Sequence, residues 1–139
     1  MDQKRRAISD YSKAIELNPG NADAYMSRGL IYGSRDQYDK AIADFNKAIE
    51  INPRDDLAHI SRGLSYAGKE QYDKAIADCN KAAEISPRHT KAYTSRALVY
   101  YTKGDFDKAW EDVHLAQSLG TRVDPEFLED LREESGRQR

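Results

Sequence analysis

Apolar residues recur along most of the chain at the three- and four-residue spacing of amphipathic helices. Over residues 38–51 the apolar stripe consists of Tyr38, Ala41, Ile42, Phe45, Ala48 and Ile49. Asn52-Pro53 follows, and because helical backbone is disfavoured before a proline, we expect this helix to end there. A preceding helix is expected over residues 22–35, with Asn21 as its N-cap. The two segments predict a helical hairpin with a short turn at 36–37.

This hairpin pattern repeats with a period of 34 residues. Pro19, Pro53 and Pro87 have that spacing, and residues 22–55 and 56–89 are identical at 21 of 34 positions. The period divides a single domain into a half repeat (1–21), three full repeats (22–55, 56–89 and 90–123) and a different C-terminal segment (124–139). We expect an all-α solenoid of antiparallel hairpins. A short eighth helix over 125–134 is expected to cap its end.

Small residues recur in the middle of each predicted first helix. Gly29 and Gly63 have the same position in successive repeats, and Ala97 follows in the third. A glycine inside a helix costs about 1 kcal/mol relative to alanine. Its recurrence therefore indicates that two helices approach closely at this point.

Several repeating features together resemble the tetratricopeptide repeat. They are the 34-residue period, the small residue in the first helix, the alanines of the second helix, the closing prolines and the tyrosines Tyr32, Tyr66 and Tyr100. The resemblance covers residues 1 to about 123. The sequence departs from the family pattern in three places. The half repeat lacks a first helix, Thr121 stands where the third repeat should have its closing proline, and residues 124–139 do not follow the pattern. The resemblance implies a right-handed superhelix whose first helices line a concave, peptide-binding groove.

Charged residues also recur with this period. Arginines interrupt the first helices, and aspartates recur in the second. Folding the hairpin at residue 36 brings Arg28 level with Asp44, so we expect a structural ion-pair ladder: Arg28–Asp44, Arg62–Asp78 and Arg96–Asp112. The alternative is pairing between neighbouring repeats, as Asp10–Arg28, Asp44–Arg62 and Asp78–Arg96. A third interpretation is a row of arginines that reads a ligand.

The resemblance implies that the first helices supply the binding face. The residues at the corresponding positions are Met26, Ser27, Leu30, Leu57, Ile60, Ser61, Leu64, Lys91, Thr94, Ser95, Leu98 and Tyr101. Within this set, Ser27, Ser61 and Ser95 form a row of hydroxyls that can donate and accept hydrogen bonds with a peptide backbone. The alternative is that a neighbouring molecule, or the rest of a longer protein, covers part of this face.

One subclass of the family binds the C-terminal carboxylate of chaperones through a clamp of lysine, asparagine and arginine side chains. The matching positions here hold Met26, Leu30, Ser61, Lys91 and Ser95, of which only Lys91 fits. One lysine cannot supply the several donors that such a clamp needs. We therefore expect a different kind of peptide ligand.

The composition narrows the function further. Hydrophobic residues make up 39% of the chain and charged residues 33%, and the net charge is −2. Nucleic-acid-binding domains are usually basic, so we expect no nucleic-acid partner. No run of about 18 apolar residues exists, and no hydrophobic leader follows Met1. We therefore expect a cytoplasmic protein with no membrane association.

Residues capable of catalysis are not arranged for it. His59, His89 and His114 form no metal-binding or catalytic motif, so we expect no enzyme activity, cofactor or metal. His59 has the position in its repeat that Tyr25 and Tyr93 have in the other two. Cys79 occupies the helix stripe of Phe45. Both are expected to be packing residues, with Cys79 as a buried, inert thiol.

The half repeat predicts a contact surface of its own. Its helix, over about residues 4–17, carries Ile8, Tyr11 and Ile15 in its apolar stripe. No first helix precedes it, so we expect part of these side chains to face water and to mediate a homodimer. A fragment with a frayed first helix is the alternative.

The sequence thus predicts a non-enzymatic protein–protein interaction module that binds a peptide segment of a partner protein. The alternatives are a structural module that self-associates through its terminal repeats and a fragment of a larger scaffold protein.

Overall fold

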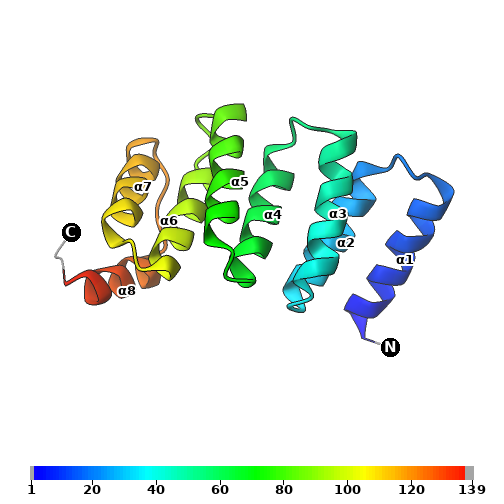
Figure 1. Cartoon of the computed structure of the whole chain (residues 1–139), viewed down its shortest axis with the longest axis horizontal. Coiled ribbons are helices and arrows are strands. Elements are labelled where there is room, and N and C mark those ends of the chain that lie inside the picture. The colour runs from blue at the N-terminus through cyan, green and yellow to red at the C-terminus, as the bar shows by residue number, and fades with distance from the viewer. Residues whose placement is uncertain (1, 137–139) are drawn as a thin grey trace.

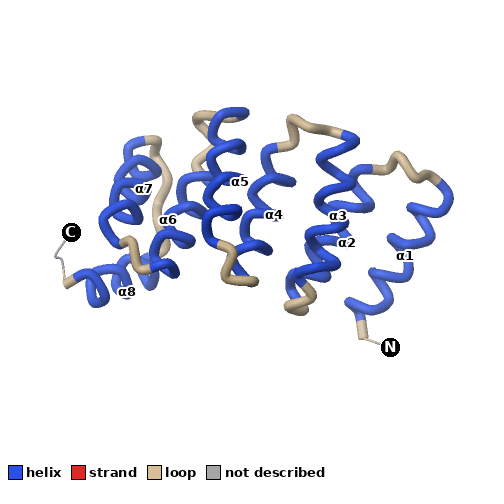
Figure 2. Tube along the Cα trace, viewed as in Figure 1, coloured by secondary structure: helices blue, strands red, loops and turns tan. Residues whose placement is uncertain are grey.

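The structure, a computed structural model, describes residues 2–136 as an array of eight helices with no strand (Figures 1 and 2). The helices are α1 (Gln3–Leu17), α2 (Ala22–Ser34), α3 (Tyr38–Ile51), α4 (Asp56–Gly68), α5 (Tyr72–Ile85), α6 (Lys91–Lys103), α7 (Phe106–Ser118) and α8 (Pro125–Ser135). Successive hairpins lie side by side from the N-terminal to the C-terminal end of the array (Figure 1). The all-α helical-repeat fold predicted from the sequence is confirmed.

The helix boundaries follow local rules. The Asn21 side chain accepts a hydrogen bond from the Ala24 backbone N–H (3.1 Å), and Asp55 accepts one from Ala58 (3.2 Å). Each satisfies a donor that the first turn of a helix leaves unpaired. Helix α3 ends at Ile51, and Asn52, the residue before the proline, has non-helical backbone angles. The N-cap and the helix end predicted for the first full repeat are therefore correct.

Glycines permit close packing within the first two hairpins. A Cβ atom at Gly29 would lie 2.7 Å from the Phe45 ring. A Cβ atom at Gly63 would lie 3.0 Å from the Ala75 carbonyl oxygen and 3.1 Å from the Asp78 Cβ. These contacts explain why a glycine stands in the middle of both helices, as the repeated spacing indicated.

Stacking between hairpins makes the array continuous. Helix α3 packs against both α2 and α4, and α5 packs against both α4 and α6. Ion pairs between neighbouring repeats reinforce this stacking. Lys69 lies 2.5 Å from Asp39, and Lys103 lies 3.2 Å from Asp73, one repeat further along.

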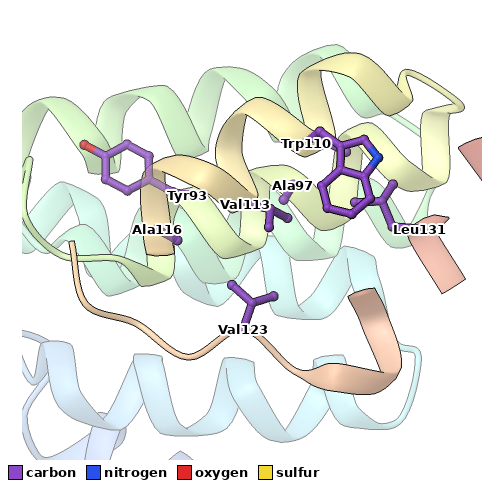
Figure 3. Close-up of a cluster of buried hydrophobic side chains, with 8 residues drawn as sticks. Tyr93, Ala97, Trp110, Val113, Ala116, Val123 and Leu131 are labelled. Carbon is purple, nitrogen blue, oxygen red and sulfur yellow. The ribbon is translucent and has the colours of Figure 1, made fainter. Parts of the chain in front are cut away.

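Helix α8 covers the end of the third repeat. Its Leu131 is fully buried beside Trp110 of α7, within a core cluster that also includes Val113 and Val123 (Figure 3). The Trp110 indole N–H donates a hydrogen bond to the Ser135 hydroxyl (3.2 Å). The predicted capping helix is therefore present, one residue longer than expected.

Candidate functional site

One face of the helices α2, α4 and α6 carries a continuous groove. A pocket of about 210 Å³ includes Leu30 and Leu64 in its lining, one of about 420 Å³ includes Leu64 and Leu98, and one of about 360 Å³ includes Leu98 and Phe127. Because adjoining pockets share a leucine, they form one track from α2 to α8. We call this track the groove. Its leucines have equivalent positions in the three repeats, and Leu30 and Leu98 are about half exposed.

Most of the residues predicted for the binding face lie at or near the surface. Those that line the three pockets are Leu30, Ser61, Leu64, Lys91, Thr94 and Leu98. Leu57 is exposed, and Met26 and Ser27 are half-buried, without lining a pocket of the groove. Tyr101 is half-buried, and its ring contacts those of Phe106 (6.0 Å between centroids) and Phe127 (5.5 Å).

Two residues assigned to the binding face are not accessible. Ile60 is 0% exposed because it packs against Ala82 of α5 and Ala92 of α6. Ser95 of α6 is 7% exposed. The prediction that both contribute to the binding surface is therefore wrong, and the three serines do not form an open row of hydroxyl groups.

The ion pairs form within each hairpin, which is the first of the arrangements considered above. In the second repeat, Arg62 donates from Nε to Asp78 Oδ2 (2.9 Å) and from Nη2 to Asp78 Oδ1 (2.7 Å). The same two-bond geometry joins Arg28 to Asp44, and Arg96 to Asp112. These hydrogen bonds raise the pKa of Arg62 above its ordinary value.

The ladder lies away from the groove. Arg28 and Leu30 are two residues apart, so about 200° of helical rotation separates their side chains. They therefore point to opposite sides of α2, and the same holds for the equivalent pairs of α4 and α6. A row of arginines that reads a ligand in the groove is excluded by this geometry.

The third arginine nitrogen has partners that the sequence analysis did not identify. Arg28 Nη1 donates to the Ser12 hydroxyl (3.0 Å), and Arg62 Nη1 donates to Asn46 Oδ1 (2.9 Å). Arg96 bonds to Asn80 in the same way (2.7 Å). The acceptor always belongs to the preceding repeat, so each arginine links two repeats. These acceptors could have been found from the sequence, because a polar residue recurs two positions after the aspartate in the second helix of each of these repeats.

His59 and Cys79 have packing roles. His59 Nε2 lies 3.0 Å from the Pro53 carbonyl oxygen, and Tyr93 donates to the equivalent carbonyl of Pro87 (2.6 Å). The histidine therefore takes the place of the tyrosine in this column. Cys79 is fully buried, and its burial raises the pKa of the thiol to about 12. Such a thiol is not a nucleophile at neutral pH.

The first helix has no fully buried residue. Ile8, Tyr11 and Ile15 of α1 are half-buried, and Leu17 is 88% exposed. The partial exposure predicted for this stripe is confirmed. Its role in self-association remains a prediction.

Other kinds of site find no support among residues 2–136. These residues contain no group of three or more histidine, cysteine, aspartate or glutamate side chains that could hold a metal ion. No helix in this part of the chain combines the length and the hydrophobicity needed to cross a membrane.

Solved structures with the same architecture include a crystal structure of MamA. It is 30% identical to this chain, with a TM-score of 0.76 over 84% of this chain and 68% of that chain. MamA from Desulfovibrio magneticus RS-1 is 26% identical, with a TM-score of 0.77 over 84% and 66% of the two chains. The first TPR of Spaghetti (RPAP3), bound to the HSP90 peptide SRMEEVD, is 24% identical, with a TM-score of 0.74 over 83% and 90%.

Comparison with curated proteins found no match. Comparison with protein families gave matches that follow the repeats. The family described as tetratricopeptide repeat matches residues 22–55 and 57–89, and the one described as TPR repeat matches residues 5–35. Together these matches cover more than half of the chain, and two of them coincide with the hairpins α2–α3 and α4–α5. The chain belongs to the tetratricopeptide repeat family.

Proposed function

We propose that this chain is a non-enzymatic protein-interaction module whose groove binds a peptide segment of a partner protein. The observation that carries the proposal is the continuous track of pockets along α2, α4 and α6. Leu30 and Leu98 leave apolar surface exposed there. Exposed apolar surface gathered in a groove is typical of a contact site and unfavourable in water without a partner.

The relatives support this proposal at the level of the fold. The structure of the Spaghetti TPR with its HSP90 peptide shows that a stack of this shape can hold a peptide. The partner of this chain is expected to differ, because Lys91 is the one residue of the carboxylate clamp that it retains. Buried Cys79 and the repeated, ion-paired carboxylates support a role in binding rather than in catalysis.

The introduction of negative charge into the groove tests the proposal. A chain carrying Leu30→Glu and Leu98→Glu is compared with one carrying Leu17→Glu and Leu115→Glu, whose leucines are exposed outside the groove. We expect the groove variant to lose peptides selected on the wild type from a random library, while the control retains them. Circular dichroism should show the same helicity in both. Equal binding by the two variants would contradict the proposal.

A further inference from the structure

Two positions that line the pocket between the first two repeats hold small residues. Gly33 lines it from α2, and the equivalent residue of the third repeat is Tyr101. Ser65 lines it from α4, where the other two repeats have Ile31 and Val99. The equivalent pocket between the second and third repeats is lined by Ala67 and Val99 at these two positions. The pocket between the first two repeats therefore differs from it in having a glycine and a hydroxyl group in its wall. We call the pocket between the first two repeats the anchor pocket.

The size and the walls of the anchor pocket suit an aromatic ring. Its volume is about 210 Å³, and its apolar lining comes from Leu30, Leu64, Phe45 and Tyr38. An apolar cavity of about 150 Å³ in another protein binds benzene. The anchor pocket can thus accept a ring that carries a further polar group.

A buried hydroxyl indicates what that polar group is. Ser65 is 5% exposed, and its hydroxyl donates to the Ser61 carbonyl oxygen (3.1 Å). Its oxygen keeps lone pairs that can accept a hydrogen bond inside the pocket. An indole N–H or a phenol O–H can donate to this oxygen, whereas phenylalanine and leucine leave it without a donor.

A lysine adds a preference for charge. Lys91 also lines the anchor pocket, and it is exposed. Among the residues that the structure describes, its ammonium group forms no ion pair. No other charged residue lines this pocket. A carboxylate of the partner is the group that complements it.

We infer that the anchor pocket binds a tryptophan or tyrosine side chain of the partner peptide, next to an aspartate or glutamate that pairs with Lys91. This inference rests on the proposed function of the groove. It adds the identity of the residue that the peptide inserts between the first and second repeats.

Substitutions at Gly33 can fill the anchor pocket without disturbing the fold. A Cβ atom at Gly33 would lie 3.8 Å from the Ser65 hydroxyl oxygen and 3.9 Å from the Ala41 Cβ, which are ordinary contacts. Gly33→Ala should therefore fold normally and keep the pocket. Gly33→Leu extends into the pocket and closes it, at a position where the third repeat already carries the larger Tyr101.

The experiment selects peptides from a displayed random library on the whole 139-residue chain. Individual peptides are then measured by fluorescence polarisation. We expect the selected peptides to contain tryptophan or tyrosine beside an acidic residue. Gly33→Leu should lower the affinity for these peptides at least tenfold, whereas Gly33→Ala should leave it unchanged. Ser65→Ala should reduce the preference for tyrosine over phenylalanine by about three- to tenfold. Lys91→Glu should lower the affinity for acidic peptides, whereas Lys13→Glu on α1 should leave it unchanged.

The outcomes distinguish the two levels of the proposal. Selected peptides that have aliphatic anchors, or that bind the wild type and Gly33→Leu equally, would overturn the anchor pocket. The proposed function of the groove would still be supported if Leu30→Glu with Leu98→Glu abolished the binding of these peptides. A library that yields no peptide dependent on these leucines would overturn both proposals.

Discussion

Removing the Leu131 side chain should detach the C-terminal cap from the array. Leu131 is fully buried against Trp110, and it is the only residue of α8 within the described part of the chain that is fully buried (Figure 3). Replacing a buried leucine with alanine costs about 2–5 kcal/mol. Phe127 and Leu128 are only partly buried, so little apolar contact would remain to compensate. Since repeat arrays are stabilised mainly by contacts between neighbours, we expect Leu131→Ala to release α8 before the other helices unfold.

The chain provides its own reporter for this event. Trp110 is the only tryptophan, and it contacts the cap. In a urea titration of Leu131→Ala, the fluorescence of Trp110 should change at a lower midpoint than the helical circular dichroism signal. Leu17→Ala is the matched control, because Leu17 is 88% exposed, and its effect should stay within about 0.5 kcal/mol. If the two signals of Leu131→Ala coincided at the wild-type midpoint, the capping role of α8 would be refuted.

Three further predictions concern the ladder, the thiol and the first helix. Arg62→Met should lower the free energy of unfolding by about 3–5 kcal/mol because it removes both arginine hydrogen bonds to the buried Asp78 carboxylate. Adding Asp78→Leu should restore part of the lost free energy, and a double variant whose loss in urea titrations equals the sum of the two single losses would contradict the pairing. With a pKa of about 12, Cys79 should stay protonated and unreactive towards a thiol reagent at pH 8 in the folded chain, and react once denaturant unfolds it; fast reaction without denaturant would argue against its burial. If α1 mediates a dimer, Ile8→Glu with Tyr11→Glu should yield monomers in sedimentation, and a monomeric wild type would refute self-association.

Much of the fold was predictable because its determinants are local. The residues before the prolines end α3 and α5, asparagine and aspartate side chains cap α2 and α4, and the 34-residue period aligns these signals. The pairing of Arg28 with Asp44 followed from their equal distances from the turn. The caps, the helix ends and the ion pairs each depend on residues within a single hairpin or at its ends.

The accessibility of the site was less predictable because it depends on neighbouring repeats. Ile60 has the helix position of Met26, yet only Ile60 is fully covered, by Ala82 and Ala92 of the following helices. A repeat alignment assigns a residue to a helix face, and it does not show how much of that face the next hairpin buries. The anchor pocket was missed for the same reason, since Gly33 and Ser65 come from different repeats.

The two sides of each first helix differ: one holds the array together, and the other lines the groove that we propose as the binding site. Arg28 and its equivalents are identical in all three repeats, and they bond to their own hairpin and to the preceding repeat. On the opposite side, Leu30 and its equivalents supply a uniform apolar track, while the column of Gly33 changes to a tyrosine by the third repeat. Substitutions in that column alter the groove without removing an ion pair. The groove can therefore acquire a specific pocket where the repeats differ, because the positions that they share already hold the helices in place.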